Sequence, residues 1–110
     1  MGTLSAGQVI LVPFPFSELS QTKVRPVVCL ASAGHDDWIL CQITSNSYGD
    51  PLAIPISASD LTVGSLISQS FVRPGKLFTA HKSLSIRSVA TLSASALDHI
   101  VEAVIGILKQ

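Results

Sequence analysis

Arg25, Thr44 and Ser45 are the residues of this chain whose types and spacing suit phosphate chemistry. They lie at the ends of two apolar segments, 24–31 and 38–44, which a short polar segment joins into a predicted hairpin. In that hairpin the arginine faces the two hydroxyl residues. Its guanidinium offers a planar fork of donors that matches a phosphate, and a hydroxyl beside it can orient the same group or a proton in transit. A structural alternative stays open, in which the threonine only hydrogen-bonds the strand edge.

The register of this hairpin depends on its turn. If the turn is centred on His35, Leu30 faces Leu40 and Cys29 faces Cys41. Both cysteines lie inside apolar segments, so we expect buried free thiols rather than a disulfide. Two cysteines without paired Cys-x-x-C spacing give little support for zinc, and we predict neither a metal nor a cofactor.

Two further groups of residues could contact a single nucleic-acid strand. The rings of Phe14 and Phe16 alternate across two prolines and point to one side. Exposed rings would stack on unpaired bases, but a place in the core or against a partner is the favoured alternative. A basic patch forms if the loops carrying Lys23 and residues 73–76 converge, although separately solvated charges are equally compatible. The cations concerned are Lys23, Arg25, Arg73, Lys76, Lys82 and Arg87.

Short strands and one helix would have to position these residues. Apolar runs bounded by glycine, proline or polar turns predict strands at 9–12, 24–31, 38–44 and 52–56, with shorter candidates at 70–72, 76–79 and 85–92. From Ser93 onward, apolar residues recur at helical spacing, which predicts an amphipathic helix over about 93–109. The predicted fold class is mainly β (α+β), a small barrel with the C-terminal helix packed on it.

The composition limits the classes of function. The 110 residues fit one domain, 1–110, and the 47% apolar content excludes a disordered chain. Charged residues make up 13% and the net charge is zero, so nothing global indicates a polyanion partner. Because sixteen serines supply much of the remaining polarity, this uncharged surface favours a buried interface, and we expect a homodimer. The longest apolar stretch, 9–16, is too short for a bilayer and no secretory signal is visible, so the cytoplasm is the expected location.

Three segments resemble the PemK/MazF family of toxins of type II toxin-antitoxin systems. They are GQVILVPFPFSELSQTKVRPVVCL (7–30), CQITSNSYGDP (41–51) and SFVRPGKLFTAHKS (70–83). The resemblance implies an SH3-like barrel with a C-terminal helix. It also implies a homodimeric mRNA interferase that cleaves single-stranded RNA without a metal, and an antitoxin partner whose flexible tail blocks the RNA groove.

The resemblance also implies roles for individual residues. Arg25 and Thr44 match the family's catalytic arginine and threonine, the pair that the predicted hairpin brings together. Gln21 and Lys23 match RNA-binding positions in the loop before the arginine. Arg73 matches a basic position found in part of the family, and Lys76 follows it in the same segment.

This sequence departs from the family pattern at three positions where many members carry an acidic residue. They are occupied by Gln8, Ser20 and Gly75, so a general base has to come from elsewhere. Glu18 and His81 are the candidates, and an ordinary imidazole pKa near neutrality favours the histidine. Two alternatives to a ribonuclease therefore stay open. One is a weakened or inactive SH3-like module that still binds an antitoxin peptide, and the other is a protein-targeting toxin similar to the gyrase poisons.

Overall fold

A computed structural model of the chain describes residues 4–15, 22–47, 49–66 and 69–110. Its strands form a seven-stranded antiparallel sheet in the order β4-β6-β3-β2-β1-β7-β5. The elements are β1 (Gln8–Pro15), β2 (Thr22–Gly34), β3 (Asp37–Thr44), β4 (Ile54–Ile56), β5 (Leu61–Gly64), β6 (Ser70–His81), β7 (Arg87–Leu92) and the helix α1 (Ala94–Leu108). Two short 3-10 helices, η1 (Ala58–Asp60) and η2 (Lys82–Leu84), join strands.

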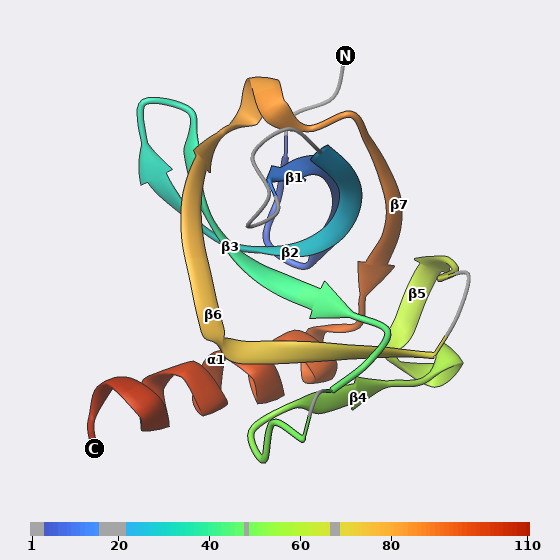
Figure 1. Cartoon of the computed structure of the whole chain (residues 1–110), viewed down its shortest axis with the longest axis vertical. Coiled ribbons are helices and arrows are strands. Elements are labelled where there is room, and N and C mark those ends of the chain that lie inside the picture. Colours follow the sequence, from blue (N-terminus) through green and yellow to red (C-terminus); the bar gives the residue numbers. More distant parts are fainter. Residues whose placement is uncertain (1–3, 16–21, 48, 67–68) are drawn as a thin grey trace.

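The sheet curls into a half-barrel, and α1 lies across one end of it (Figure 1). Beta strands dominate the described residues, so the predicted mainly β class with a C-terminal helix is confirmed. The helix itself was predicted over about 93–109 and extends over Ala94–Leu108. Ser93 caps it, because its Oγ accepts a hydrogen bond from the Ala96 N–H at 3.2 Å. Among the described helices, none is long and apolar enough to span a bilayer.

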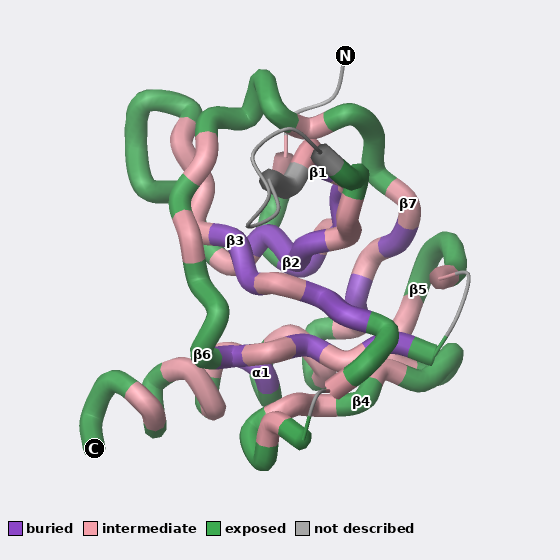
Figure 2. The backbone as a smooth tube through the Cα atoms, viewed as in Figure 1, coloured by how far each residue is buried: buried purple, intermediate pink, exposed green. Residues whose placement is uncertain are grey.

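The central strands are buried on both faces, which explains their nearly continuous apolar sequences (Figure 2). Along β1, β2 and β3, buried side chains alternate between two clusters, as the two-residue period of a strand requires. On β1, for example, Val9 belongs to the cluster that Ile100 of α1 covers, whereas Ile10 belongs to the other. The first cluster contains Val9, Val28, Cys41, Ile43, Val72, Ala90, Leu92 and Ile100, and the second Ile10, Val12, Val27, Cys29 and Leu40.

The hairpin of β2 and β3 turns at His35 and Asp36, which both have positive φ, 55° and 64°. The turn is therefore where the sequence predicted it, and the pairs of Ser32 with Trp38 and of Ala31 with Ile39 follow the predicted register. From Cys29 onward the predicted register is wrong. Cys29 faces Leu40, and Cys41 faces Val28. Two bulges in β2, between Ser32 and Gly34 and between Cys29 and Ala31, each shift the pairing by one residue, and the second causes the departure from the predicted register. Both cysteines are free and buried, as expected.

Prolines explain where other predicted strand limits differ. The predicted segments 70–72 and 76–79 belong to one strand, β6. Its pairing with β3 is interrupted between Val72 and Leu77, and Pro74 lies in this unpaired bulge, where no backbone N–H is required. Similarly, β1 continues through Pro13 and Pro15. The pairing of β1 with β7 ends at Leu11. The residues of β1 after Leu11 therefore donate no backbone hydrogen bond to β7, and prolines, which lack an N–H, are tolerated there. Strand β5 was not predicted.

Candidate functional site

Arg25, Thr44 and Ser45 line one hollow of about 670 Å³. Arg25 lies on β2, opposite Val12 of β1. The ladder between β2 and β3 reaches its last pair at Val27 and Gln42, and two further steps of the same register bring Arg25 level with Thr44. The structure therefore brings together the arginine and the hydroxyl residues that the predicted hairpin places opposite one another. Ser65, Ser70 and a second arginine, Arg87, line the same hollow.

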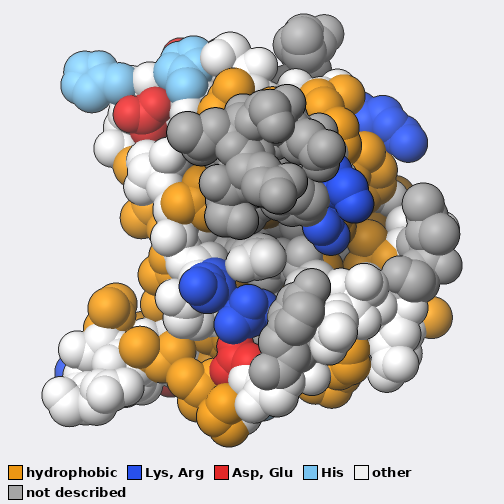
Figure 3. All heavy atoms as spheres, viewed as in Figure 1, with side chains coloured by type: hydrophobic (Ala, Val, Ile, Leu, Met, Phe, Trp, Pro, Cys, Tyr) orange, Lys and Arg blue, Asp and Glu red, His pale blue; other side chains and the backbone are white. Residues whose placement is uncertain are grey.

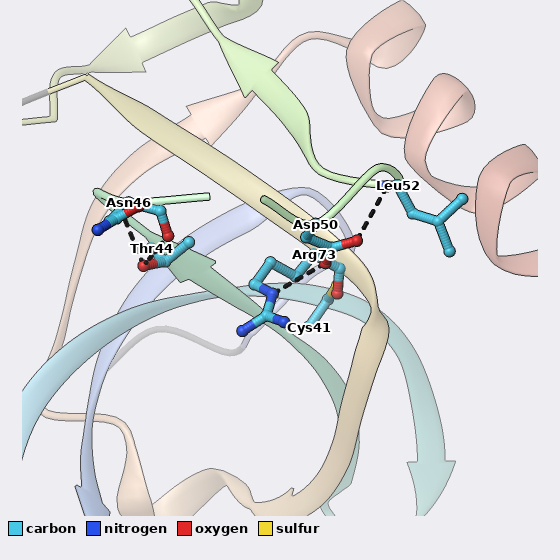
Figure 4. Close-up of polar contacts among 6 residues, drawn as sticks. All are labelled: Cys41, Thr44, Asn46, Asp50, Leu52 and Arg73. Carbon is cyan, nitrogen blue, oxygen red and sulfur yellow. Dashed lines mark hydrogen bonds and ion pairs between the residues drawn. The ribbon is translucent and has the colours of Figure 1, made fainter. Parts of the chain in front are cut away.

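The Thr44 side chain is only 4% exposed, and its hydroxyl is held by the next turn of chain (Figure 4). Oγ1 donates to the Asn46 carbonyl oxygen at 3.0 Å and accepts from the Asn46 N–H at 3.2 Å. A hydroxyl has one proton to donate and two lone pairs, so one acceptor position is not used by these two bonds. The threonine thus fixes the start of segment 45–53 and orients its hydroxyl at the wall of the hollow.

An ion pair that the sequence did not predict ties the same segment to β6. Arg73 Nε donates to Asp50 Oδ2 at 2.9 Å, and Asp50 Oδ1 accepts from the Leu52 N–H at 2.9 Å (Figure 4). The bond from Arg73 holds the pKa of Asp50 below its usual value, and the Leu52 amide and the positive charges of Arg73 and Lys76 act in the same direction. No local signal reveals this pair, because its members are 23 positions apart.

Other basic residues of the predicted RNA-binding set lie on β6 and β2. Lys76 is exposed on β6, and Lys23 is exposed on β2 opposite Phe14 of β1. In Figure 3, Lys and Arg side chains gather at the middle of the viewed face, with an acidic side chain beside one group. Gln21, Phe16 and Glu18 lie outside the described residues, as does the ring of Phe14.

His81 is not brought to the hollow. It pairs with Asp37 at the start of β3, whereas Thr44 ends that strand, seven residues or about 24 Å of extended chain away. Its Nδ1 accepts a hydrogen bond from the Ser83 N–H at 3.1 Å and so caps η2. This position gives the histidine a local structural role. Within the described ranges, no three His, Cys, Asp or Glu residues group as metal ligands would.

The fold and the hollow define a curled β half-barrel that presents arginine and hydroxyl side chains on the walls of one cavity. The sequence profile of PemK-like, MazF-like toxins of type II toxin-antitoxin systems matches residues 5–108. This chain therefore belongs to that toxin family. No curated protein sequence matches it significantly.

Solved structures agree on the fold. A MazE-MazF crystal structure from Deinococcus radiodurans superposes with a TM-score of 0.79 at 19% identity and covers 100% of this chain and 99% of its own. A mycobacterial endoribonuclease in complex with its cognate antitoxin gives 0.73 at 14% identity, with coverages of 99% and 96%. The Mycobacterium tuberculosis toxin MazF-mt6 gives 0.66 at 20% identity, with coverages of 91% and 96%.

Proposed function

We propose that this protein is a metal-independent endoribonuclease toxin, an mRNA interferase that cleaves single-stranded RNA. The observation that carries the proposal is the presence of Arg25 and Thr44 on the wall of one hollow. Both positions match the family's catalytic pair. The similarity in fold to the mycobacterial endoribonuclease supports the same activity.

The proposed reaction is a transesterification within the RNA strand. The ribose 2′-oxygen forms a bond to the adjacent phosphorus while the bond from phosphorus to the 5′-oxygen of the next nucleotide breaks. The products are a 2′,3′-cyclic phosphate and a 5′-hydroxyl, so no water is consumed. Negative charge accumulates on the phosphoryl oxygens, and Arg25 stabilises that charge because a guanidinium keeps its proton at any working pH. Thr44 orients the phosphate when its hydroxyl turns its one proton from the Asn46 carbonyl oxygen to a phosphoryl oxygen.

The 2′-hydroxyl proton needs an acceptor, and the leaving 5′-oxygen needs a proton. Glu18 is the proposed acceptor, because His81 lies at the far end of β3, and solvent water supplies the proton to the leaving 5′-oxygen. Glu18 belongs to the segment that joins β1 to β2. Pro15 and Thr22, which flank this segment, pair in the same ladder as Arg25. Ser45 and the basic residues Lys23, Arg73 and Lys76 bind the strand, together with Gln21. The rings of Phe14 and Phe16 supply stacking or core contacts.

The proposed partners are a second copy of the chain and an antitoxin, and the proposed location is the cytoplasm, where transcripts lie. Apolar side chains at the end of α1 support a protein interface, since Leu108 is 72% exposed and Ile105 40%. The Deinococcus MazE-MazF structure and the mycobacterial complex support an antitoxin partner. The resemblance to the family implies that the flexible tail of this antitoxin enters the RNA groove.

The test is cleavage of single-stranded RNA in excess EDTA by the purified protein and its Arg25→Ala variant. We expect cleavage with cyclic-phosphate ends, and a loss of at least ~10²-fold in rate for the variant, because one electrostatic donor is removed. Lys109→Gln, a change on exposed chain at the end of α1, is the charge control. Equal rates for Arg25→Ala and the wild type would overturn the assignment. Absence of cleavage with retained antitoxin binding would favour a binding module, and inhibition of a topoisomerase would favour a gyrase-directed toxin.

A further inference from the structure

Arg87 is a second arginine on the wall of the hollow, and nothing in the proposed reaction uses it. It opens β7, where it pairs with Leu11 of β1. Leu11 also pairs with Pro26 of β2, the residue after Arg25. Since neighbouring strands lie about 4.8 Å apart, the Cα atoms of Arg87 and Pro26 are roughly 10 Å apart across β1. The three paired residues all line the hollow.

Among the residues that the structure describes, those lining the hollow carry charge of one sign only. The described lining contains two arginines, one threonine and three serines, and none of the described lining residues is an aspartate or glutamate. Arg87 is exposed, and the ion pairs found among the described residues join Arg73 to Asp50 and Lys82 to Asp36. Within those residues, Arg87 therefore has no carboxylate partner that would explain it as a structural ion pair. In a chain of zero net charge, two of the residues that line this hollow are arginines.

We propose that Arg87 binds the phosphate next to the scissile one, so that the hollow holds two consecutive phosphates of the RNA strand. The inference rests on the proposed function, in which Arg25 meets the scissile phosphate. A guanidinium binds a phosphate through two parallel hydrogen bonds, which fixes orientation as well as charge. Two such contacts on opposite sides of β1 align the strand. Arg87 is thus a positioning residue, separate from the reacting atoms.

Binding to a strand that cannot be cleaved tests this role without the chemistry. The probe is a fluorescein-labelled RNA of mixed sequence with methylated 2′-hydroxyls, and its affinity is measured by anisotropy at several salt concentrations. Each phosphate neutralised on a single strand contributes about −0.7 to the slope of log affinity against log salt. We expect Arg87→Gln to make the slope shallower by about 0.7, and Arg87→Lys to keep it, because a lysine still neutralises one phosphate. Lys109→Gln changes the net charge equally and should keep the wild-type slope.

The outcomes separate this inference from the function on which it rests. A wild-type slope in Arg87→Gln, with binding otherwise normal, overturns the role of Arg87 and leaves RNA binding by the hollow intact. Equal changes in Arg87→Gln and Lys109→Gln also overturn it, since the effect would then follow net charge alone. Wild-type protein that does not bind the strand at any salt concentration removes the proposed function, and the Arg87 contact with it.

Discussion

The guanidinium of Arg73 on β6 and the carboxylate of Asp50, beyond the end of β3, form an ion pair with 2.9 Å between Nε and Oδ2. Both side chains are largely sheltered, 19% and 14% exposed. The same carboxylate accepts a hydrogen bond from the Leu52 N–H, so it fixes the turn at residues 50–52 and fastens that turn to β6. Thr44 holds the start of segment 45–53 through Asn46. Two polar anchors therefore determine the shape of the chain beside the hollow.

The Asp50 anchor makes stability depend on pH. Its pKa is lowered by Arg73 in the folded protein, so its stabilisation is fully present above the unfolded pKa, about 3.9, and is lost as pH falls through the lower folded value. We expect Asp50→Asn to be less stable than the wild type at pH 7, and the difference to shrink below about pH 3.9. Urea unfolding from pH 7 to pH 2.5 measures this. Asp98→Asn, exposed on α1, is the control, and parallel pH curves for wild type and Asp50→Asn would contradict the prediction.

The Thr44 anchor can be separated from the methyl group of the same side chain. Thr44→Val keeps the shape but removes the hydroxyl that donates to and accepts from Asn46, and should cost about 1 kcal/mol of unfolding free energy. Thr44→Ser keeps both hydrogen bonds and should retain most of the stability and of the RNA cleavage. Urea unfolding and cleavage rates are measured on the same preparations. If valine supports cleavage as well as serine does, the hydroxyl has no part in the reaction.

Local patterns predicted most of the strands and the helix, because apolar periodicity and turn residues act over a few neighbours. Strand β5 escaped prediction because it pairs only with β7 among the described strands and exposes Val63 at 64%, so its sequence carries no buried alternation. The register error at Cys29 has a similar cause, since a bulge leaves no mark in residue types. Arg25 and Thr44 were predictable because one hairpin sets their proximity. The pairing of Arg73 with Asp50 depends on how β6 packs against β3, and only the assembled sheet reveals it.

The cysteines provide a test of the two cores. Burial raises the pKa of Cys29 from 9.0 to about 11 and that of Cys41 to about 12, so the reactive thiolate at pH 8 falls by about 100-fold or more. We expect an aromatic disulfide reagent to modify neither thiol in the folded protein over about an hour, and to modify both within seconds in 6 M guanidinium. Rapid reaction of one cysteine without denaturant would show that its core cluster opens.

Gly64, at the rim of the hollow, cannot be replaced by a larger residue without strain, because its backbone conformation disfavours a side chain and neighbouring backbone atoms leave no room for one. Its φ is +77°, and an added Cβ would collide with the Val89 carbonyl oxygen and lie 2.8 Å from the Ala90 Cα. Backbone atoms cannot rotate away as the end of a side chain can, so Gly64→Ala should cost at least ~2 kcal/mol of unfolding free energy.

Gly106 of α1 provides the matched control, because an added Cβ there meets no atom within 4 Å. In a helix, alanine loses less backbone entropy than glycine on folding, so Gly106→Ala should stabilise the protein by ~0.5–1 kcal/mol. Urea unfolding should therefore give a lower free energy of unfolding for Gly64→Ala and a higher one for Gly106→Ala, although the chemical change is the same. A Gly64→Ala variant as stable as the wild type would mean that β5 can leave β7, and the rim of the hollow would then be an adjustable edge rather than a fixed wall.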